Sequence, residues 1–203
     1  MANRTYSSDQ LGHWEECISL PPRFRRLASP ILDLEYLITL HTHQIVKIPY
    51  ENLSLHYTPT PRVSLNPQDL FQKIVGNARG RGGYCMEGSI FFNSILRSLG
   101  FKVERGVGVP QGKYDGWVHI VNIVTLPDGS KYSVDVAFGG DGQVVPLPLT
   151  PFSEEPPVFT NFGSQQIRLI HAPVPPENQE SPAATQSLSS QYAKFVDEEP
   201  QRF

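Results

Sequence analysis

The spacing of apolar residues changes at Gly100, and no other feature of the sequence constrains the fold more. Before Gly100, apolar residues recur every three or four positions, which is typical of helices with one buried face. After it, alternating or continuous apolar runs at residues 101–109, 117–126 and 131–138 predict β-strands. The sequence therefore predicts an α+β fold, a helical bundle followed by an antiparallel β-barrel or sheet.

The chain divides into three predicted regions. Residues 1–100 form the helical bundle, and residues 101–170 form the β-barrel domain. Within the last region, 171–203, positions 172–191 are mainly Pro, Glu, Asn, Gln, Ser and Ala, with a single Val and a single Leu. Such a composition cannot bury a core, so we expect a mostly disordered tail.

Charge and cysteine content narrow the partners and the compartment. The formal net charge of -3 gives no support for a nucleic acid or an anionic membrane as a partner. The two cysteines, Cys17 and Cys85, are too few for a disulfide framework and suit a reducing compartment. No apolar run approaches the roughly 18 residues of a membrane span, and no apolar segment follows the N-terminus. We therefore expect a soluble, cytoplasmic protein.

The helical half contains four predicted helices. The first begins with a capping box formed by Ser7 and Gln10, and Cys17 falls on its apolar stripe, which predicts a core position for this cysteine. Start signals predict the other helices after Asp33, after Asn66 and at Cys85.

Two histidines of the second helix, His41 and His43, do not predict a metal site. Positions two apart lie on different faces of a helix, and no Cys or acidic side chain is suitably spaced to join them. We expect no bound metal.

Residues 79–87 (RGRGGYCME) bring Cys85 to the start of the fourth helix. Unpaired N–H groups at a helix N-terminus, with Arg79 and Arg81 close in sequence, would favour the thiolate over the thiol. The alternative is a buried structural cysteine that follows a flexible loop. The flanking residues favour the reactive cysteine.

The turn at residues 127–129 sets the register of two predicted strands. Pro-Asp-Gly is typical of a three-residue hairpin loop that ends in a left-handed glycine, and residue 126 then pairs with residue 130. In this register His119 and Asp135 are diagonal neighbours on one face, with Cα atoms about 7–8 Å apart. A two-residue Asp-Gly loop would instead place them on opposite faces.

His119 and Asp135 together predict chemistry that neither predicts alone. Taken singly, His119 is a core histidine and Asp135 an edge residue. A buried Asp needs a partner, and a His beside it would be held in the tautomer whose free nitrogen can accept a thiol proton. We expect Cys85 to be the nucleophile, His119 the base and Asp135 the orienting residue.

Four stretches in this order resemble the arylamine N-acetyltransferases: residues 48–53 (IPYENL), residues 81–87 (RGGYCME), the His119 strand and residues 134–139 (VDVAFG). The resemblance implies a helical bundle carrying the Cys, a β-barrel carrying the His and Asp, a third α/β lid region, and a triad similar to that of cysteine proteases. The implied reaction is a ping-pong transfer of acetyl from acetyl-CoA, through the cysteine, to an arylamine, arylhydroxylamine or arylhydrazine. Acetyl is the default acyl group, and another acyl-CoA that carries a larger group, such as malonyl or propionyl, stays open.

The resemblance also implies binding residues for the acceptor. Tyr50 and Phe138 would be aromatic walls of the acceptor pocket, with Trp117 as a further candidate, since a flat apolar slot suits an arylamine. Glu51 and Arg81 match family positions that are structural.

A glycine-rich segment follows the predicted Asp strand. Gly139, Gly140 and Gly142 could offer backbone N–H groups to the phosphates of CoA. The alternative is a simple turn, which is what a glycine-rich segment after a strand more often forms.

The sequence departs from the family pattern at three places. Gly88 and Ser89 follow Glu87 where the family has a larger residue and Asn, and Gly80 replaces a usual Asn. The chain also ends early, so most of the lid region is expected to be missing, and self-association could cover an open barrel.

The sequence leaves two other functions open. One is a cysteine hydrolase or transglutaminase-like enzyme that uses the same three residues. The other is an inactive relative that acts as a binding protein.

Overall fold

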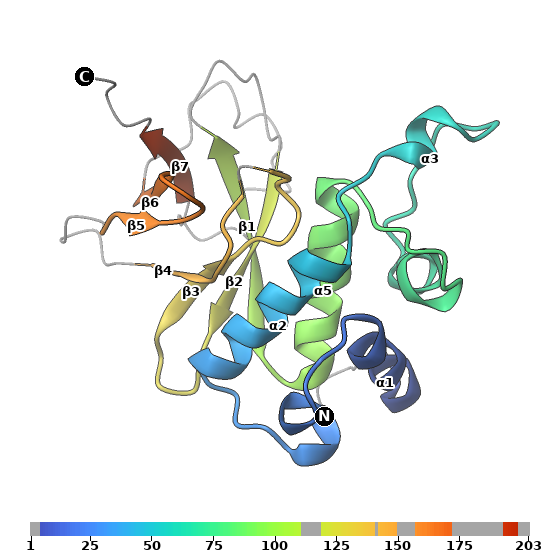
Figure 1. The fold of residues 1–203 in the computed structure, drawn as a ribbon, viewed down its shortest axis with the longest axis horizontal. Helices are drawn as coiled ribbons and strands as arrows, with labels where there is room; N and C mark the ends of the chain where they lie inside the picture. The colour runs from blue at the N-terminus through green and yellow to red at the C-terminus, as the bar shows by residue number, and fades with distance from the viewer. Residues whose placement is uncertain (1–4, 111–118, 141, 150–156, 172–192, 199–203) are drawn as a thin grey trace, which may run out of the picture.

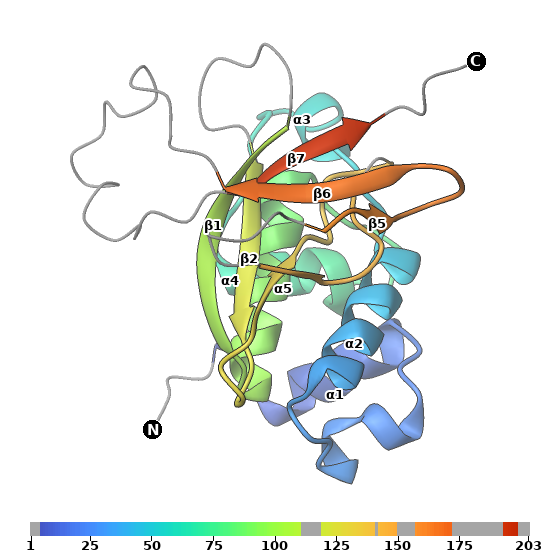
Figure 2. The ribbon, with the colours of Figure 1, turned by 90° about the vertical axis from the view of Figure 1, so that its left-hand side faces the viewer.

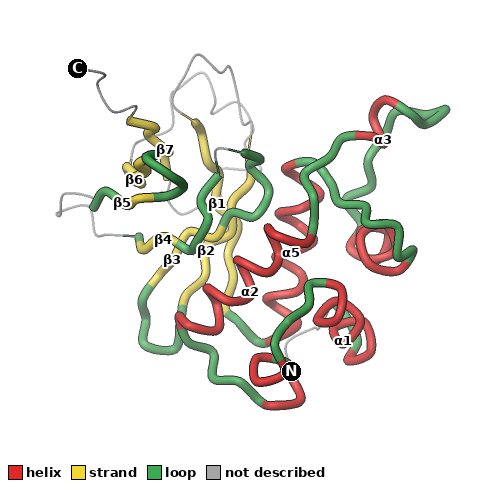
Figure 3. Tube along the Cα trace, viewed as in Figure 1, coloured by secondary structure: helices red, strands yellow, loops and turns green. Residues whose placement is uncertain are grey.

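The computed structural model describes residues 5–110, 119–140, 142–149, 157–171 and 193–198. Helices gather on one side of the molecule and strands on the other (Figure 3). The α+β architecture predicted from the change in apolar spacing is confirmed. In the part of the chain that the structure describes, no helix is both long and apolar enough to cross a membrane.

The helices follow one another through the first half of the chain (Figure 1). They are α1 (Ser8–Cys17), α2 (Leu34–Lys47), α3 (Leu53–His56), α4 (Pro67–Phe71) and α5 (Cys85–Leu99), with 3-10 turns at Pro22–Phe24 and Arg26–Ala28 and a π-helical turn at Gln72–Gly76. The four predicted helices are present, and the short α3 was not predicted.

Side-chain caps begin the predicted helices. Ser7 Oγ accepts a hydrogen bond from the N–H of Gln10 at 3.2 Å, and the Gln10 side chain accepts one from the N–H of Ser7 at 3.0 Å, which confirms the capping box. Asp33 and Asn66 likewise cap α2 and α4. Helix α5 ends at Gly100, whose φ of +108° suits a glycine.

The core position predicted for Cys17 is wrong, because this side chain is exposed. Leu11, Trp14 and Ile18 form the buried stripe of α1. At about 100° of rotation per residue, Cys17 is turned well away from Ile18, while Glu15 falls close to the stripe and is buried. The spacing of apolar residue types alone did not separate the edge of the stripe from its centre.

The strands form one twisted sheet. They are β1 (Lys102–Pro110), β2 (His119–Thr125), β3 (Lys131–Val134), β4 (Leu147–Pro148), β5 (Phe159–Thr160), β6 (Gln166–His171) and β7 (Ala193–Glu198), in the spatial order β4-β3-β2-β1-β7-β6-β5. Figure 2 shows β6 lying across one end of β1 and β2, and β7 running beside the curved end of β1.

The closed β-barrel implied by the family resemblance is not seen in the described residues. The two-residue strands β4 and β5 lie at opposite ends of the strand order, and each pairs with one neighbour. The sheet is therefore open. Most neighbouring strands are antiparallel, as predicted, but β1 and β7 are parallel.

The register predicted from the Pro-Asp-Gly turn is confirmed. The N–H of Leu126 donates to the carbonyl of Ser130 at 2.9 Å, and Gly129 has a φ of +89°. Asn122 lies opposite Val134, as the pairing across this turn requires.

Strand β3 is shorter than predicted. It ends at Val134 instead of continuing to residue 138, and the last pair that it makes with β2 precedes Asp135. Asp135 Oδ1 accepts a hydrogen bond from the N–H of Ala137 at 3.0 Å. Such local bonding by an Asp side chain competes with strand pairing, which accounts for the early end of the strand.

Part of the region expected to be a disordered tail is a strand. Residues 193–198 form β7, which pairs with β1 on one side and β6 on the other. Long-range pairing of this kind leaves little trace in local composition. Residues 172–192 and 199–203, for which disorder was also expected, lie outside the described residues.

Buried polar side chains join α5 to β2. Ser89 Oγ donates to the carbonyl of Ile120 at 2.6 Å, Asn93 Nδ2 donates to Asn122 Oδ1 at 2.8 Å, and Asn122 Nδ2 donates to the carbonyl of Ser89 at 3.0 Å. The side chains of Ser89, Asn93 and Asn122 are all buried. These bonds set the helix that carries the cysteine against the strand that carries the histidine.

Replacing Asn122 should destabilise the fold. In Asn122→Ala, the amide of Asn93 and the carbonyl of Ser89 each lose a buried partner, and we expect the free energy of unfolding to fall by about 1–3 kcal/mol. Urea denaturation measures this change. Asn77→Ala, at an exposed asparagine, is the control and should change stability by less than about 0.5 kcal/mol. Equal losses in the two variants would contradict the prediction.

Candidate active site

Cys85 is the first residue of α5 and is partly buried. Tyr84 precedes the helix in an extended conformation, and its N–H donates to Glu87 Oε2 at 3.2 Å. The Glu87 side chain therefore folds back on the helix start. This places the thiol at a helix N-terminus, as predicted from residues 79–87.

Two sequence stretches of the family resemblance lie against each other. The N–H of Gly83 donates to the carbonyl of Pro49 at 3.4 Å, and the N–H of Glu51 donates to the carbonyl of Gly83 at 3.1 Å. A Cβ atom on Gly82 would lie 1.7 Å from the Pro49 carbonyl oxygen, so the approach requires a glycine. The glycines before Cys85 thus allow close backbone packing.

Ion pairs among Lys73, Arg81, Glu51 and Glu87 stabilise this packing. Arg81 donates to Glu51 at 2.8 and 3.0 Å. Lys73 lies 3.3 Å from Glu51 and donates to both oxygens of the buried Glu87 at 2.8 and 2.9 Å. Lys73 was not predicted as a functional residue, because lysines are ordinarily exposed and its position in the sequence matches no motif.

The pKa of Glu51 reflects the same network. Burial alone would raise it, but hydrogen bonds from the N–H of Leu53 and from Arg81, together with the charge of Lys73, hold the pKa of Glu51 below its usual range. Glu51 therefore stays ionised at neutral pH. Its charge links the Cys85 loop to the segment that contains Tyr50.

His119 and Asp135 meet just beyond the last paired residues of β2 and β3. His119 Nε2 lies 2.6 Å from Asp135 Oδ2, and both residues are buried. The diagonal relation predicted from the turn thus corresponds to a direct hydrogen bond. Because the carboxylate engages Nε2, the other ring nitrogen, Nδ1, is left for a second partner.

The Cys85 side chain is hydrogen-bonded to the same imidazole. Burial would lower the pKa of His119, but the hydrogen bonds to Asp135 and Cys85 and the charges of both groups outweigh it and raise the pKa to about 9. The structure therefore brings the three predicted side chains together. A protonated imidazole between a carboxylate and a sulfur can hold or release a proton at the sulfur.

Two of the predicted aromatic side chains contact this cluster. The Phe138 ring meets the His119 ring edge-on, with centroids 5.1 Å apart. Tyr50 is half exposed, and its hydroxyl is hydrogen-bonded to the Cys85 backbone. Tyr84 was not predicted as part of the site, although it immediately precedes Cys85 in the quoted motif. Trp117, the further candidate, lies outside the described residues.

The glycine-rich segment after Asp135 forms a turn. Gly139 has a φ of +98°, and the N–H of Gly142 donates to its carbonyl at 3.2 Å. Gly139 and Gly140 are exposed, and Cβ atoms on them would meet nothing within 4 Å. Asn161 Nδ2 donates a hydrogen bond to the Gly142 carbonyl at 2.8 Å, and Asn161 was not predicted from the sequence.

The two histidines of α2 have separate partners. His41 Nε2 lies 2.9 Å from the carbonyl oxygen of Asp135, and His43 Nδ1 lies 2.9 Å from that of Ile18. In the described ranges, no three His, Cys, Asp or Glu side chains are grouped to hold a metal ion.

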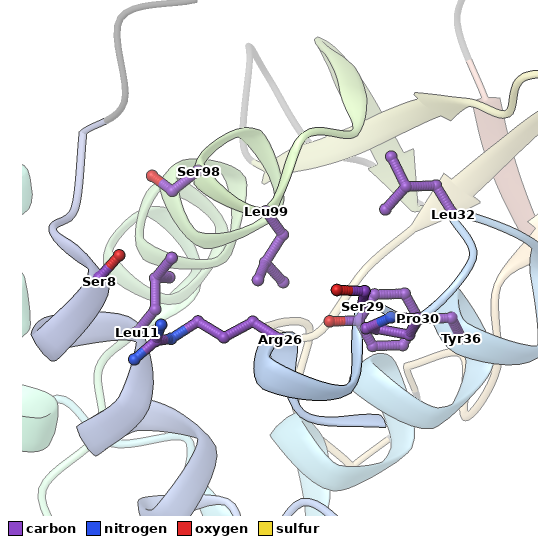
Figure 4. Close-up of a pocket in the computed structure, with 9 residues that line it drawn as sticks. All are labelled: Ser8, Leu11, Arg26, Ser29, Pro30, Leu32, Tyr36, Ser98 and Leu99. Carbon is purple, nitrogen blue, oxygen red and sulfur yellow. The ribbon is translucent and has the colours of Figure 1, made fainter. Parts of the chain in front are cut away.

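A separate cavity of about 260 Å³ lies near the other end of α5 (Figure 4). Arg26 Nε and the Tyr36 hydroxyl line it and have no hydrogen-bond partner among the described residues. Polar groups in a cavity of this size suit ordered water. Since Ser98 and Leu99 line this cavity and Cys85 begins the same helix, the cavity is distinct from the cysteine site.

Comparisons with known proteins identify related acyltransferases. A family model described as N-acetyltransferase matches residues 33–179. The chain is 36% identical over 169 residues to N-malonyltransferase FDB2 of Gibberella moniliformis, covering 71% of this chain and 48% of that protein. It is 35% identical over 137 residues to arylamine N-acetyltransferase 2 of Rattus norvegicus, covering 64% and 46%. The chain thus spans about half the length of these curated relatives.

A solved structure is also similar. Arylamine N-acetyltransferase of Mycobacterium marinum in complex with CoA superimposes with a TM-score of 0.59 at 26% identity. The match covers 78% of this chain and 59% of that one.

The raised pKa of His119 predicts a pH-dependent stability. The folded state holds this proton more tightly than the unfolded state, so the stabilisation is full below pH 6.5 and is lost as the pH rises through about 9. Urea denaturation of wild type and His119→Gln across this range measures it. The stability difference between the two proteins should shrink as the pH rises. A difference that does not vary with pH would contradict the account.

The close approach of the two backbones predicts that Gly82→Ala is poorly tolerated. The new methyl group would overlap the Pro49 carbonyl, and we expect unfolding free energy to fall by about 1–3 kcal/mol, with slower alkylation of Cys85. Gly140→Ala adds a methyl group into open space and is the stability control. The prediction fails if Gly82→Ala is as stable as Gly140→Ala.

Proposed function

The chain belongs to the arylamine N-acetyltransferase family, and from this premise we propose that it transfers an acyl group from acyl-CoA to an aromatic amine through a thioester on Cys85. One observation carries the proposal: the buried imidazole of His119 is hydrogen-bonded both to Asp135 and to the thiol of Cys85. Cys85 would be the nucleophile, His119 the proton carrier and Asp135 the residue that orients the imidazole.

In the first half-reaction, the Cys85 thiolate attacks the carbonyl carbon of the acyl-CoA thioester. A new carbon–sulfur bond forms, the bond from the carbonyl carbon to the CoA sulfur breaks, and the imidazolium of His119 gives its proton to the departing CoA thiolate. One thioester replaces another, so the step is nearly isoenergetic. A His119 pKa of about 9 supports this step, because the imidazole is protonated at neutral pH.

In the second half-reaction, the amine nitrogen attacks the acyl-cysteine. The neutral His119 left by the first step accepts a proton from the nitrogen, the amide forms, and the Cys85 thiolate leaves. The hydrogen bond to Asp135 Oδ2 supports this role, because it holds the ring in one orientation through both steps. Each cycle thus returns the thiolate–imidazolium pair.

The proposed acceptor is an arylamine, arylhydroxylamine or arylhydrazine. Tyr50 and Phe138, with Tyr84 beside them, support this class, since flat aromatic side chains close to the thiol suit a planar acceptor.

The proposed donor site includes the glycine segment. The N–H of Gly142 already donates within the turn, so Gly139 and Gly140 are the stronger candidates for CoA phosphate oxygens. The CoA complex named for the Mycobacterium marinum relative supports CoA as the carrier.

The acyl group is proposed as acetyl by default, with malonyl as the second candidate. The first choice follows the name of the rat relative, and the second follows that of the Gibberella relative. Propionyl-CoA completes the series, because it matches malonyl in chain length but carries no carboxylate.

A single-turnover experiment tests the function. Excess protein is mixed with acetyl-, malonyl- or propionyl-CoA, and free CoA is followed by a thiol reagent before an aromatic amine is added. We expect stoichiometric CoA release followed by amide formation. Cys85→Ser should abolish both, and Asp135→Asn should slow CoA release by up to about 10⁴-fold.

The outcomes separate the other functions. Faster discharge by water than by any amine would indicate a hydrolase, and faster discharge by peptide amines a transglutaminase-like enzyme. No CoA release with any donor would contradict acyl transfer and favour a binding protein.

A further inference from the structure

A fully buried histidine outside the proposed triad contacts the residue that orients it. His41 of α2 is 0% exposed, and its Nε2 lies 2.9 Å from the backbone carbonyl oxygen of Asp135. We propose that His41 is a positioning residue that holds Asp135 against His119, an inference that rests on the proposed function of this site.

The position of Asp135 explains why its backbone needs such a partner. Asp135 follows the last pair between β3 and β2, Asn122 opposite Val134, so β-sheet pairing does not hold its peptide group. The residue is nevertheless 2% exposed, and a buried carbonyl without a partner is costly. His41 supplies the hydrogen bond from a helix 94 positions away in sequence.

The chemistry of the contact defines the state of His41. A carbonyl oxygen can only accept, so Nε2 must carry the proton and donate it. Burial lowers the pKa of His41 to about 4, with the hydrogen bond to Asp135 offsetting only part of the effect. His41 is therefore neutral throughout the range in which His119 would work. It acts as a permanent donor and exchanges no proton.

Three contacts then fix Asp135. Oδ2 bonds His119, Oδ1 accepts from the N–H of Ala137 at 3.0 Å, and the carbonyl accepts from His41. Helix α5 also packs closely against this segment. A Cβ atom on Gly88 would lie only 2.8 Å from the Cβ atom of Ala137. Without His41, the backbone carbonyl of Asp135 loses its hydrogen bond, and β-sheet pairing does not replace it.

The same helix offers a matched control. His43 lies two residues further along α2 and also bonds a backbone carbonyl, that of Ile18, at 2.9 Å. Replacing His43, which is partly buried, removes another histidine–carbonyl bond of the same helix without touching Asp135. A general loss of α2 packing should therefore affect both variants, whereas loss of positioning should affect only one.

The experiment compares His41→Leu, His41→Gln and His43→Leu with wild type. The pKa of His119 is measured by NMR titration, with His119→Gln used to assign the signal, and alkylation of Cys85 by iodoacetamide is timed at pH 7. Circular dichroism establishes that each variant is folded.

We expect His41→Leu to lower the His119 pKa from about 9 toward 6.5 and to slow alkylation about 10- to 100-fold. His41→Gln keeps an N–H donor at similar reach and should restore most of both values, and His43→Leu should leave both unchanged.

The inference is overturned if folded His41→Leu keeps the wild-type His119 pKa, or if His43→Leu lowers it equally. If His41→Leu does not fold, His41→Gln decides: a wild-type His119 pKa in this folded variant supports the inference, and a loss of the raised pKa contradicts it. If wild type releases no CoA, the proposed function fails, while the His119 titration still decides the role of His41.

Discussion

The hydrogen bond between His119 and Asp135 is the interaction on which the rest of the structure depends. It joins two backbone segments just past the end of their ladder, and buried polar bonds from Ser89, Asn93 and Asn122 hold α5, which carries Cys85, against β2. A shift of α5 would carry Cys85 away from the imidazole. The register of β2 and β3 and the packing of α5 on β2 therefore together determine whether Cys85, His119 and Asp135 meet.

Supporting contacts reach this pair from several parts of the chain. Lys73 and Glu51 hold the loop before Cys85, and His41 reaches Asp135 from α2. Buried charges and histidines are costly unless they are paired, so the bonds that Lys73, Glu51 and His41 Nε2 make here favour a site held in one arrangement. Chemistry of this kind depends on such rigidity, because small displacements of reacting groups slow it strongly.

Local signals in the sequence predicted a large part of this arrangement. The capping box at Ser7, the turn before Gly129 and the glycine-rich approach to Cys85 act over a few residues, and the structure has all three. Contacts that depend on distant partners were not predictable. Examples are the ion pair between Lys73 and Glu51 and the pairing of β7 with β1. For Cys17, a position at the edge of an apolar stripe was mistaken for its centre.

The most direct measurement is the site of acylation. The chain has two cysteines: Cys17, which is exposed, and Cys85, whose side chain is hydrogen-bonded to His119. After a single turnover with radiolabelled acetyl- or malonyl-CoA at neutral pH, peptide mapping locates the label. We expect an acyl group on Cys85 and none on Cys17, and we expect Cys85 to lose its acyl group when an arylamine is added. Label on Cys17 would contradict this assignment. So would acylation of Cys85 at the wild-type rate in His119→Gln.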